Sequence, residues 1–467
     1  MKRTLYRTLL AAAVGAAFQH AAFAADAKNI IFFLGDGMGP STITAARIYK
    51  YGEDGSLNMD KLERTARIKT FSNDAQTTDS APSMAAYMTG VKMNNEVISM
   101  SPDTVATEPG KDAHGNLGVN NCAAGNGKAV ATILELAKAK GKAVGSITTT
   151  ELTHATPAAT FSHICNRNAQ YAIAAQLVPG GAGYNSALLD GVDVLMGGGR
   201  NHFTPYSASN TGGRADGRDL LAELAAKGYT VAATRADMQA APAGKKFIGL
   251  YSSKSHLQYE LDRSATPPVG EGASQPSLAE MTVKAMDLLA QNQNGYFLMV
   301  EGGRIDHALH ATNAKRALVD TIAFDDAVKA ALDKAKQTDP TLANTLIVVT
   351  ADHDHTLAIN GYAKRGNPIL DINHDYKNGQ PGKDADGNTY STLVFGNGPN
   401  RPAVRSNLDS ATVLGDNYLQ ETGVRLASET HGGGDVKLFA TGVGAKAFKG
   451  TLDNTKVFTL LKSAFGF

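Results

Sequence analysis

Five apolar runs without alternation are distributed along the chain, and each has the length of a β-strand. A strand covered on both faces shows such a continuous run, whereas a strand with one face in water alternates. The runs are Ile30–Leu34, Ala143–Thr148, Val192–Met196, Tyr296–Val300 and Leu346–Thr350. Segments with helical periodicity lie between them, at Ala129–Lys140, Leu278–Gln291 and Asn313–Lys336. The pattern predicts an α/β fold, a three-layer sandwich whose central, mostly parallel sheet is flanked by helices.

Two polar stretches interrupt this pattern. Residues 102–126 are polar and contain glycine. Residues 361–430 are rich in Asn, Gly, Pro and Asp, and they contain one strand-like segment, TYSTLVFG. We expect residues 361–430 to form a crown-like surface subdomain inserted into the core.

The first residues have the features of a secretory signal peptide. A basic head, with Lys2, Arg3 and Arg7, precedes a short apolar run, Leu9–Phe18, and the small-x-small sequence 22–24 follows. A membrane anchor is the alternative, but the run is well short of the roughly 20 residues that span a bilayer. We therefore expect residues 1–24 to be removed, residues 25–467 to form the mature domain, and the product to be periplasmic or secreted.

The charge balance excludes the strongly basic proteins that bind nucleic acid through their net charge. The chain has 45 Lys and Arg against 44 Asp and Glu. Without the three basic residues of the expected leader, the net formal charge becomes about −2. No further apolar stretch reaches spanning length, so we expect neither a membrane anchor nor a nucleic-acid-binding patch.

The chain has two cysteines, Cys122 and Cys165. In an oxidising compartment they form either one disulfide or two small buried thiols. A bridge would brace the segment that carries Arg167, two residues further on.

Acidic residues and histidines follow three of the apolar runs. Asp36 follows the first, Glu301 the fourth, and Asp352 and His353 the fifth. Ligands of an α/β sheet gather beyond the carboxyl ends of its strands, so we expect these side chains to meet. Asp36 alone would be typical of a tight glycine turn. The four ionisable residues 352–355, however, cannot all be buried unpaired, and metal binding resolves that conflict.

Further candidates occur elsewhere, each with an ordinary alternative. Asp306 and His310 are spaced i, i+4, which suits either capture of zinc or a surface ion pair. Asp79 and Ser80 precede a helical stretch, where the serine is either a helix cap or a nucleophile. His431 lies in a glycine loop. Mixed Asp and His ligands suit zinc, and two zinc ions roughly 4 Å apart would clamp both oxygens of a phosphoryl transfer. Arg167 would offer a bidentate fork to the phosphoryl group.

Together these motifs, from Asp36 to His431, resemble the alkaline phosphatases. The segments VGSITTTELTHATPAATFSH, YAKRGNPI and LVFGNGP are closer to the animal-type branch than to the enteric bacterial enzyme. The resemblance implies hydrolysis of phosphate monoesters to alcohol and inorganic phosphate, through a phosphoserine intermediate, with an alkaline optimum. It also implies a homodimer, with contact most expected through residues 361–430.

The resemblance also implies a role for each candidate residue. Ser80 would be the nucleophile and Arg167 would orient the phosphate, beside Asp79. One zinc ion would be held by Asp306, His310 and His431, and a second by Asp36, Asp352 and His353. A magnesium ion would be held by Asp36, Thr156 and Glu301, while His355 would steady a zinc ligand.

At four positions this sequence has a different residue from other alkaline phosphatases. His154 and His307 stand where the enteric enzyme has an aspartate and a lysine, so the third metal is either magnesium or, through His154, zinc. Ser252 and Gln275 stand at two acidic positions of the additional calcium site of animal-type enzymes, so we expect no calcium site. The rival functions are a phosphodiesterase or sulfatase on the same core and, more weakly, a non-catalytic phosphate-binding protein.

Overall fold

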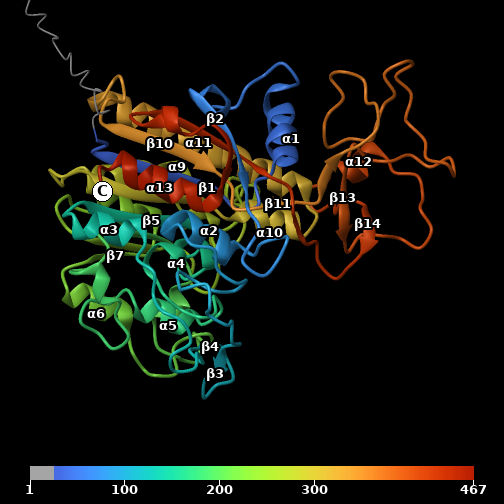
Figure 1. Cartoon of the computed structure of the whole chain (residues 1–467). Coiled ribbons are helices and arrows are strands. Elements are labelled where there is room, and N and C mark those ends of the chain that lie inside the picture. The colour runs from blue at the N-terminus through green and yellow to red at the C-terminus, as the bar shows by residue number, and fades with distance from the viewer. Residues whose placement is uncertain (1–25) are drawn as a thin grey trace, which may run out of the picture.

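A computed structural model describes residues 26–467, so the expected signal peptide, residues 1–24, lies outside the described residues. A ten-stranded sheet forms the centre of the molecule (Figure 1). In spatial order its strands are β17 (Gly450–Asp453), β2 (Arg64–Lys69), β16 (Val436–Gly442), β10 (Thr345–Thr350), β1 (Asn29–Gly35), β9 (Tyr296–Gly302), β5 (Ala143–Glu151), β6 (Val194–Gly198), β8 (Phe247–Leu250) and β7 (Thr230–Ala232). The seven strands from β10 to β7 are parallel, and β16 is antiparallel to both of its neighbours. The expected α/β fold is confirmed.

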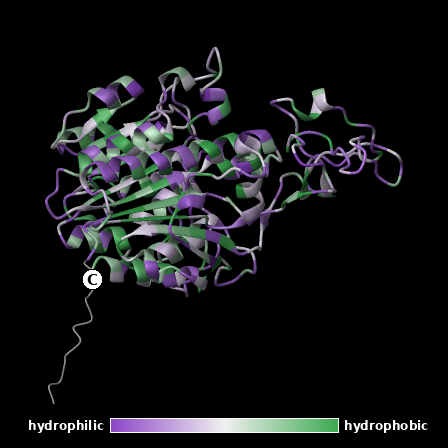
Figure 2. Cartoon of the chain, turned by 90° about the horizontal axis from the view of Figure 1, so that it is seen from above, coloured by the Kyte–Doolittle hydropathy of each residue, from purple (hydrophilic) through white to green (hydrophobic). Residues whose placement is uncertain are grey.

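Helices cover both faces of the sheet, and its strands are the most hydrophobic part of the ribbon (Figure 2). One group packs around α11 and α9, and the other around α2, α3, α4 and α13. The helices are α1 (Pro40–Tyr51), α2 (Ser80–Thr89), α3 (Ile133–Ala139), α4 (Ala155–Phe161), α5 (Gln170–Ala175), α6 (Leu220–Ala226), α7 (Arg235–Ala240), α8 (Glu260–Arg263), α9 (Leu278–Leu289), α10 (Arg304–His310), α11 (Ala314–Thr338), α12 (Ser410–Val413) and α13 (Asn454–Ala464). The central layer is thus buried on both sides, as the continuous apolar runs predict.

Local sequence explains where several elements begin. The predicted helix from Ala129 begins later, at Ile133, because Thr132 caps it and Glu135 completes a reciprocal capping box. Asn313 is likewise the cap of α11 and not its first residue. The expected strand 192–196 is shifted to β6, two residues further along the chain. Val192 precedes that strand and is buried.

A separate lobe projects from the sheet domain, on the right of Figure 1. It contains a three-stranded sheet of β12 (Leu357–Ile359), β13 (Leu393–Gly398) and β14 (Thr422–Arg425), together with α12 and long loops. Its ribbon is largely hydrophilic in Figure 2, and this agrees with the polar composition of residues 361–430. Two small pairs complete the described strands, β3 (Gly110–Lys111) with β4 (Leu117–Val119) and β11 (Asp354–His355) with β15 (His431–Gly432).

The parallel register brings the candidate residues to one edge of the sheet. Leu34 of β1 lies opposite Thr350 of β10 on one side and opposite Glu301 of β9 on the other. Thr148 of β5 also lies opposite Glu301. The carboxyl ends of four adjacent strands therefore face the same space, and the loops that follow them carry the candidate ligands.

Candidate metal centre and active site

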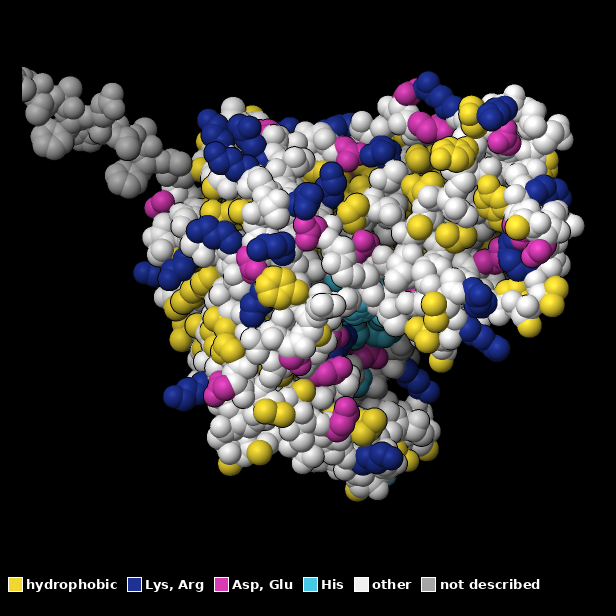
Figure 3. Space-filling view, turned by 45° about the vertical axis from the view of Figure 1, so that its right-hand side comes forward, with side chains coloured by type: hydrophobic (Ala, Val, Ile, Leu, Met, Phe, Trp, Pro, Cys, Tyr) yellow, Lys and Arg dark blue, Asp and Glu magenta, His cyan; other side chains and the backbone are white. Residues whose placement is uncertain are grey.

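Histidine and acidic side chains gather at the bottom of a hollow beside the projecting lobe (Figure 3). Three groups of these side chains each bring their ligand atoms within 4.8 Å of one another. The groups are Asp306 with His310, His355 and His431; Asp36 with Asp306 and His353; and Asp36 with His154 and Glu301. The fold thus brings together residues that are nearly four hundred positions apart in sequence.

The first group is built on the short helix α10. Asp306 and His310 lie one turn apart, and His310 Nε2 is 3.3 Å from Asp306 Oδ1. His431 arrives from β15 and places its Nε2 3.0 Å from that of His310 and 3.5 Å from Asp306 Oδ1. The i, i+4 pair is therefore part of a partly buried cluster of four side chains and not an isolated surface ion pair.

Backbone carbonyls fix the orientation of three histidines in these groups. The Nδ1 of His310 faces the carbonyl of Glu429 at 2.6 Å, that of His431 the carbonyl of Thr78 at 2.8 Å, and that of His353 the carbonyl of Asp354 at 3.1 Å. A carbonyl only accepts, so each Nδ1 carries a hydrogen, and it is the Nε2 of each ring that faces the cluster. The Nε2 atoms of His310 and His431 lie 3.0 Å apart, and they repel each other unless a metal ion or a shared proton lies between them. This arrangement is typical of metal-ligating histidines.

His355 has a different role from the other histidines. Its Nε2 lies 2.8 Å from Asp306 Oδ1 and its Nδ1 2.5 Å from Glu429 Oε2. Burial opposes a charge on the ring, but the two carboxylates outweigh it and raise the pKa of His355 to about 10. His355 thus contacts a carboxylate through each of its ring nitrogens, and its Nε2 holds Asp306 in place.

Sequence reasoning missed Glu429. Its buried carboxylate also accepts hydrogen bonds from the backbone N–H of Thr356 at 2.7 Å and from the Thr356 hydroxyl at 2.5 Å. The one signal in the sequence was its position, two residues before the candidate ligand His431.

The second group surrounds the loop after β1. His353 Nε2 is 3.2 Å from Asp36 Oδ1 and 3.6 Å from Asp352 Oδ2, and all three side chains are fully buried. Gly37 has φ 63°, and a Cβ there would lie 2.4 Å from the His355 ring, so only glycine allows this close approach. Its N–H donates to Asp352 Oδ1 at 3.0 Å.

The third group lies between β5 and β9. One oxygen of Glu301 accepts hydrogen bonds from the hydroxyls of Thr148 and Thr150, which sequence reasoning did not single out. Thr156 is buried in the first turn of α4, which begins directly after His154. The signal for these hydroxyl groups in the sequence was a run of three threonines at the end of an apolar strand.

Three buried carboxyl groups at this edge lie close enough together to influence one another's ionisation. Burial, together with their mutual repulsion, raises the pKa of Asp36 well above its usual range, that of Asp352 to about 6 and that of Glu301 to about 7. Within the described residues, one oxygen of each lacks a hydrogen-bond partner. Such groups are costly without a cation, so the donor set fits two or more metal ions.

Ser80 lies beside this cluster at the start of α2. Its hydroxyl is 3.1 Å from His353 Nε2 and 3.4 Å from Asp36 Oδ1. The cap of the helix is Asp79, whose side chain accepts from the N–H of Ala81. The alternative reading of Ser80 as a helix cap is therefore wrong.

Arg167 lies against the same helix start. It pairs with Asp79 through one terminal nitrogen, and its other terminal nitrogen lies 3.0 Å from His154 Nε2. Cys122 and Cys165 are joined in a disulfide, the first of the two alternatives considered for them, and this bond lies two residues from Arg167.

His154 belongs to a row of three histidines that extends away from Arg167. Its ring centroid is 5.3 Å from that of His307 and 5.4 Å from that of His256, a neighbour that sequence reasoning missed. Burial and adjacent positive charge lower the pKa of His154 and of His307 well below the usual value. His307 Nδ1 is 2.9 Å from a guanidinium nitrogen of Arg304, so its ring is held as a neutral acceptor.

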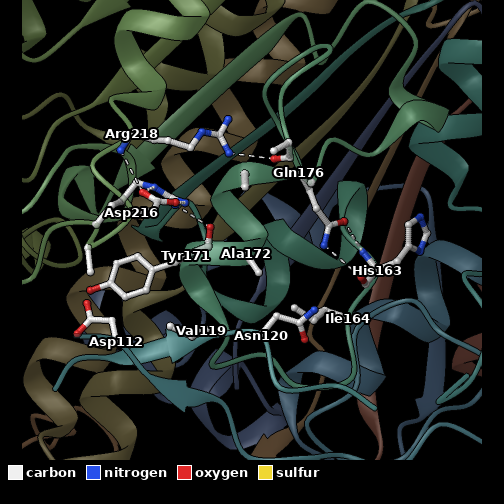
Figure 4. A pocket seen from close by; sticks show the side chains of 15 residues that line it. Asp112, Val119, Asn120, His163, Ile164, Tyr171, Ala172, Gln176, Asp216 and Arg218 are labelled. Atoms are coloured by element: carbon white, nitrogen blue, oxygen red, sulfur yellow. Dashed lines mark hydrogen bonds and ion pairs between the residues drawn. The ribbon is translucent and has the colours of Figure 1, made fainter. Parts of the chain in front are cut away.

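A different cavity, of about 440 Å³, lies between the β3–β4 hairpin and α5 (Figure 4). Its two arginines are already paired, since Arg214 binds Asp216 and Arg218 binds Glu223. None of the candidate site residues lines it. We therefore assign no part of the chemistry to this cavity.

Ser252 and Gln275, at the expected calcium position, are both buried. The Gln275 side chain accepts from the N–H of Gln258 at 2.8 Å and donates to the carbonyl of Tyr251 at 3.2 Å. The amide thus links two backbone segments directly. The absence of a calcium site remains a prediction.

The doubly wound sheet and the buried Asp and His cluster at its carboxyl edge define a metal-dependent hydrolase. A family model described as alkaline phosphatase matches residues 27–467. The chain therefore belongs to the alkaline phosphatase family, and the expected family is confirmed. It is a phosphatase that hydrolyses phosphate monoesters.

Curated relatives agree with this assignment, and solved structures share the fold. The chain is 36% identical over 447 residues to the tissue-nonspecific alkaline phosphatase of Gallus gallus, and the match covers 89% of this chain and 80% of that protein. It is 35% identical over 471 residues to the Homo sapiens isozyme, covering 92% and 82%. Among solved structures, Thermus thermophilus alkaline phosphatase has a TM-score of 0.68 at 25% identity and covers 98% of this chain and 96% of its own. The alkaline phosphatase from the Antarctic bacterium TAB5 has a TM-score of 0.66 at 24% identity, and the match covers 95% of this chain and 98% of its own.

Proposed function

We propose that Ser80 is the nucleophile of this phosphatase and that a phosphoserine forms on it during turnover. The observation that carries the proposal is the position of its hydroxyl, 3.1 Å from His353 Nε2 and at the first turn of α2. N–H groups at a helix start favour an anion, so a phosphoryl group attached to Ser80 would be stabilised there.

The remaining residues orient the phosphate and hold the metal ions. Arg167, fixed by Asp79 and His154, keeps donors free for two phosphoryl oxygens. We assign Asp306, His310 and His431 to one zinc ion and Asp36, Asp352 and His353 to a second. When bound, such ions lower the pKa of hydroxyl groups and stabilise charge on the attacking and leaving oxygens. Asp36, Glu301 and Thr156 would hold magnesium, or zinc if His154 takes part.

The context of the enzyme is also proposed. The basic and apolar character of residues 1–24 supports export to the periplasm or the medium. Among the described residues, no helix is both long and apolar enough to cross a membrane. We propose a homodimer in which the lobe formed by residues 361–430, an inserted subdomain, contributes to the contact. Exposed Tyr362 and Tyr376 on that lobe support this view.

Hydrolysis of p-nitrophenyl phosphate between pH 6 and 11 tests the proposal. Activity should be highest at alkaline pH, vanish on chelation and return when zinc and magnesium are both restored. Ser80→Ala should lose the phosphoenzyme and lower kcat by about three orders of magnitude or more, while circular dichroism and zinc content stay unchanged. Full activity of a correctly folded Ser80→Ala variant would exclude Ser80 as the nucleophile.

A further inference from the structure

Glu96 lies at the rim of the proposed active site in an uncommon backbone conformation. Its φ is 70°, in the left-handed region that non-glycine residues rarely adopt. Strained residues of this kind persist where the surrounding structure fixes them, and they cluster at functional sites.

The backbone of Glu96 connects the two residues that face the phosphate. Its N–H donates to Asp79 Oδ2 at 3.0 Å, and its carbonyl accepts from the N–H of Arg167 at 2.8 Å. The other oxygen of Asp79 pairs with the Arg167 guanidinium. Glycine would make the same two backbone bonds without steric cost, so the glutamate side chain requires an explanation of its own.

That side chain adds a second carboxylate near Arg167. The amide of Asn168, the residue after Arg167, donates to Glu96 Oε2 at 3.3 Å. After burial, which opposes its charge, Asp79 and then Glu96 are the largest influences that raise the pKa of Arg167. The guanidinium that would bind a phosphate dianion is therefore paired with one carboxylate, Asp79, and lies within the field of a second, Glu96, which is held by the neighbouring Asn168.

We propose that Glu96 limits the affinity of the site for phosphate, so that inorganic phosphate leaves faster. The inference rests on the proposed role of Arg167. A carboxylate next to the binding cation repels a dianion, and the repulsion acts on bound product as well as on substrate. Product release sets the turnover of many hydrolases, so weaker phosphate binding raises kcat, and it raises KM as well.

The test compares full-length, metal-loaded enzyme with Glu96→Gln, which keeps the side-chain length and an acceptor for Asn168 but removes the charge. The inhibition constant of inorganic phosphate, measured against p-nitrophenyl phosphate and by calorimetry, should fall about five-fold at low ionic strength. KM should fall in parallel. The difference should shrink as salt is raised, because screening weakens the interaction.

Two further variants separate charge from backbone. Glu96→Gly should bind phosphate as tightly as Glu96→Gln, since both lack the carboxylate. Glu108→Gln removes an exposed acidic group near Glu96 and should change phosphate affinity less than two-fold. Phosphate binding that is unchanged or weaker in Glu96→Gln overturns the inference, as does tightening in the glycine variant alone.

Arg167→Ala distinguishes this inference from the proposed function. Phosphate should bind far more weakly to that variant than to the parent enzyme. If it binds equally well, the proposed role of Arg167 fails. If only the Glu96 variants show no effect, the role of Arg167 stands and the inference about Glu96 is wrong.

Discussion

At the scale of single residues, Glu429 shows how an indirect contact supports a candidate ligand. Its carboxylate holds His355, which in turn holds Asp306. Asp306 and Glu429 together raise the pKa of His355, and Glu429→Gln removes one of these two charges, so the ring should hold Asp306 less firmly. We expect zinc affinity to fall about 10- to 100-fold, measured by competition with a chelating dye.

Two controls accompany this prediction. Glu421→Gln alters another carboxylate of the lobe, which pairs with Arg405, and should leave zinc affinity unchanged. The pKa of the His355 ring, followed by nuclear magnetic resonance of metal-free protein, should fall from about 10 in Glu429→Gln. Unchanged zinc affinity in a folded Glu429→Gln variant would show that His355 does not depend on this carboxylate.

The sequence indicates candidate ligands better than it indicates their supports. Asp36 and Asp352 follow apolar strands, and Asp306 and His310 share a helix face, so local periodicity places them. Glu429 contacts His355 across 74 residues of the loop-rich lobe, whose short strands carry no sequence pattern that brings these two side chains together. The left-handed φ of Glu96 is likewise invisible in its residue type, because glycine is the usual signal for that conformation.

At the scale of elements, the disulfide ties the irregular segment before α3 to the segment that carries Arg167. Cys122 and Cys165 are separated by 43 positions. Replacing both with serine should lower the free energy of unfolding by roughly 3–4 kcal/mol, because a loop of that length is no longer closed in the unfolded chain. Phosphate affinity should also fall several-fold, since Arg167 loses its nearby covalent anchor. Urea titration and phosphate inhibition measure the two effects.

Reductant provides the matched control for the disulfide. Treated parent enzyme should resemble the double serine variant, whereas the variant itself should not respond. Equal midpoints of unfolding for the parent and the variant would contradict the prediction.

Which elements the sequence predicts depends on how deeply each is buried. The central strands β1, β9, β5 and β10 were all predicted, since neighbours cover both of their faces. The strand β2 was not, because four of its six residues are exposed and its apolar content is low. Its pairing with β16 extends the sheet beyond the parallel core, and no continuous apolar run marks that region.

At the scale of the whole molecule, the hollow exists because the lobe and the sheet edge supply opposite walls. The lobe-side segment brings Glu429 and His431 against α10, where the N–H of Glu429 donates to the carbonyl of His310. The fold class followed from alternating strands and helices. The position of the lobe could not be predicted in this way. A polar composition rich in loops indicates that a segment is exposed, but not on which side of the molecule it lies.

The stability of the enzyme between about pH 4 and pH 8 should depend on Asp320, a buried carboxyl of α11 that is not one of the candidate ligands. Burial raises the pKa of this carboxyl to about 8, although the charge of Arg304 lowers it in part. A folded pKa above the unfolded value means that the folded state holds the proton more tightly. The stabilisation is therefore complete below about pH 4 and is lost as the pH rises to about 8.

Asp320→Asn keeps an acceptor for the N–H of Glu260 and removes the titration. Its Tm relative to the parent should increase from pH 5 to about pH 8, by roughly 2–4 °C in total, and then level off. Differential scanning calorimetry with excess zinc and magnesium keeps metal loading equal across the series. Asp333→Asn, an exposed carboxylate on the same helix, should give a difference that does not change with pH. If the Tm difference between Asp320→Asn and the parent is also independent of pH, the prediction is wrong. Asp320 would then be ionised already at pH 5, and its surroundings would stabilise the charge.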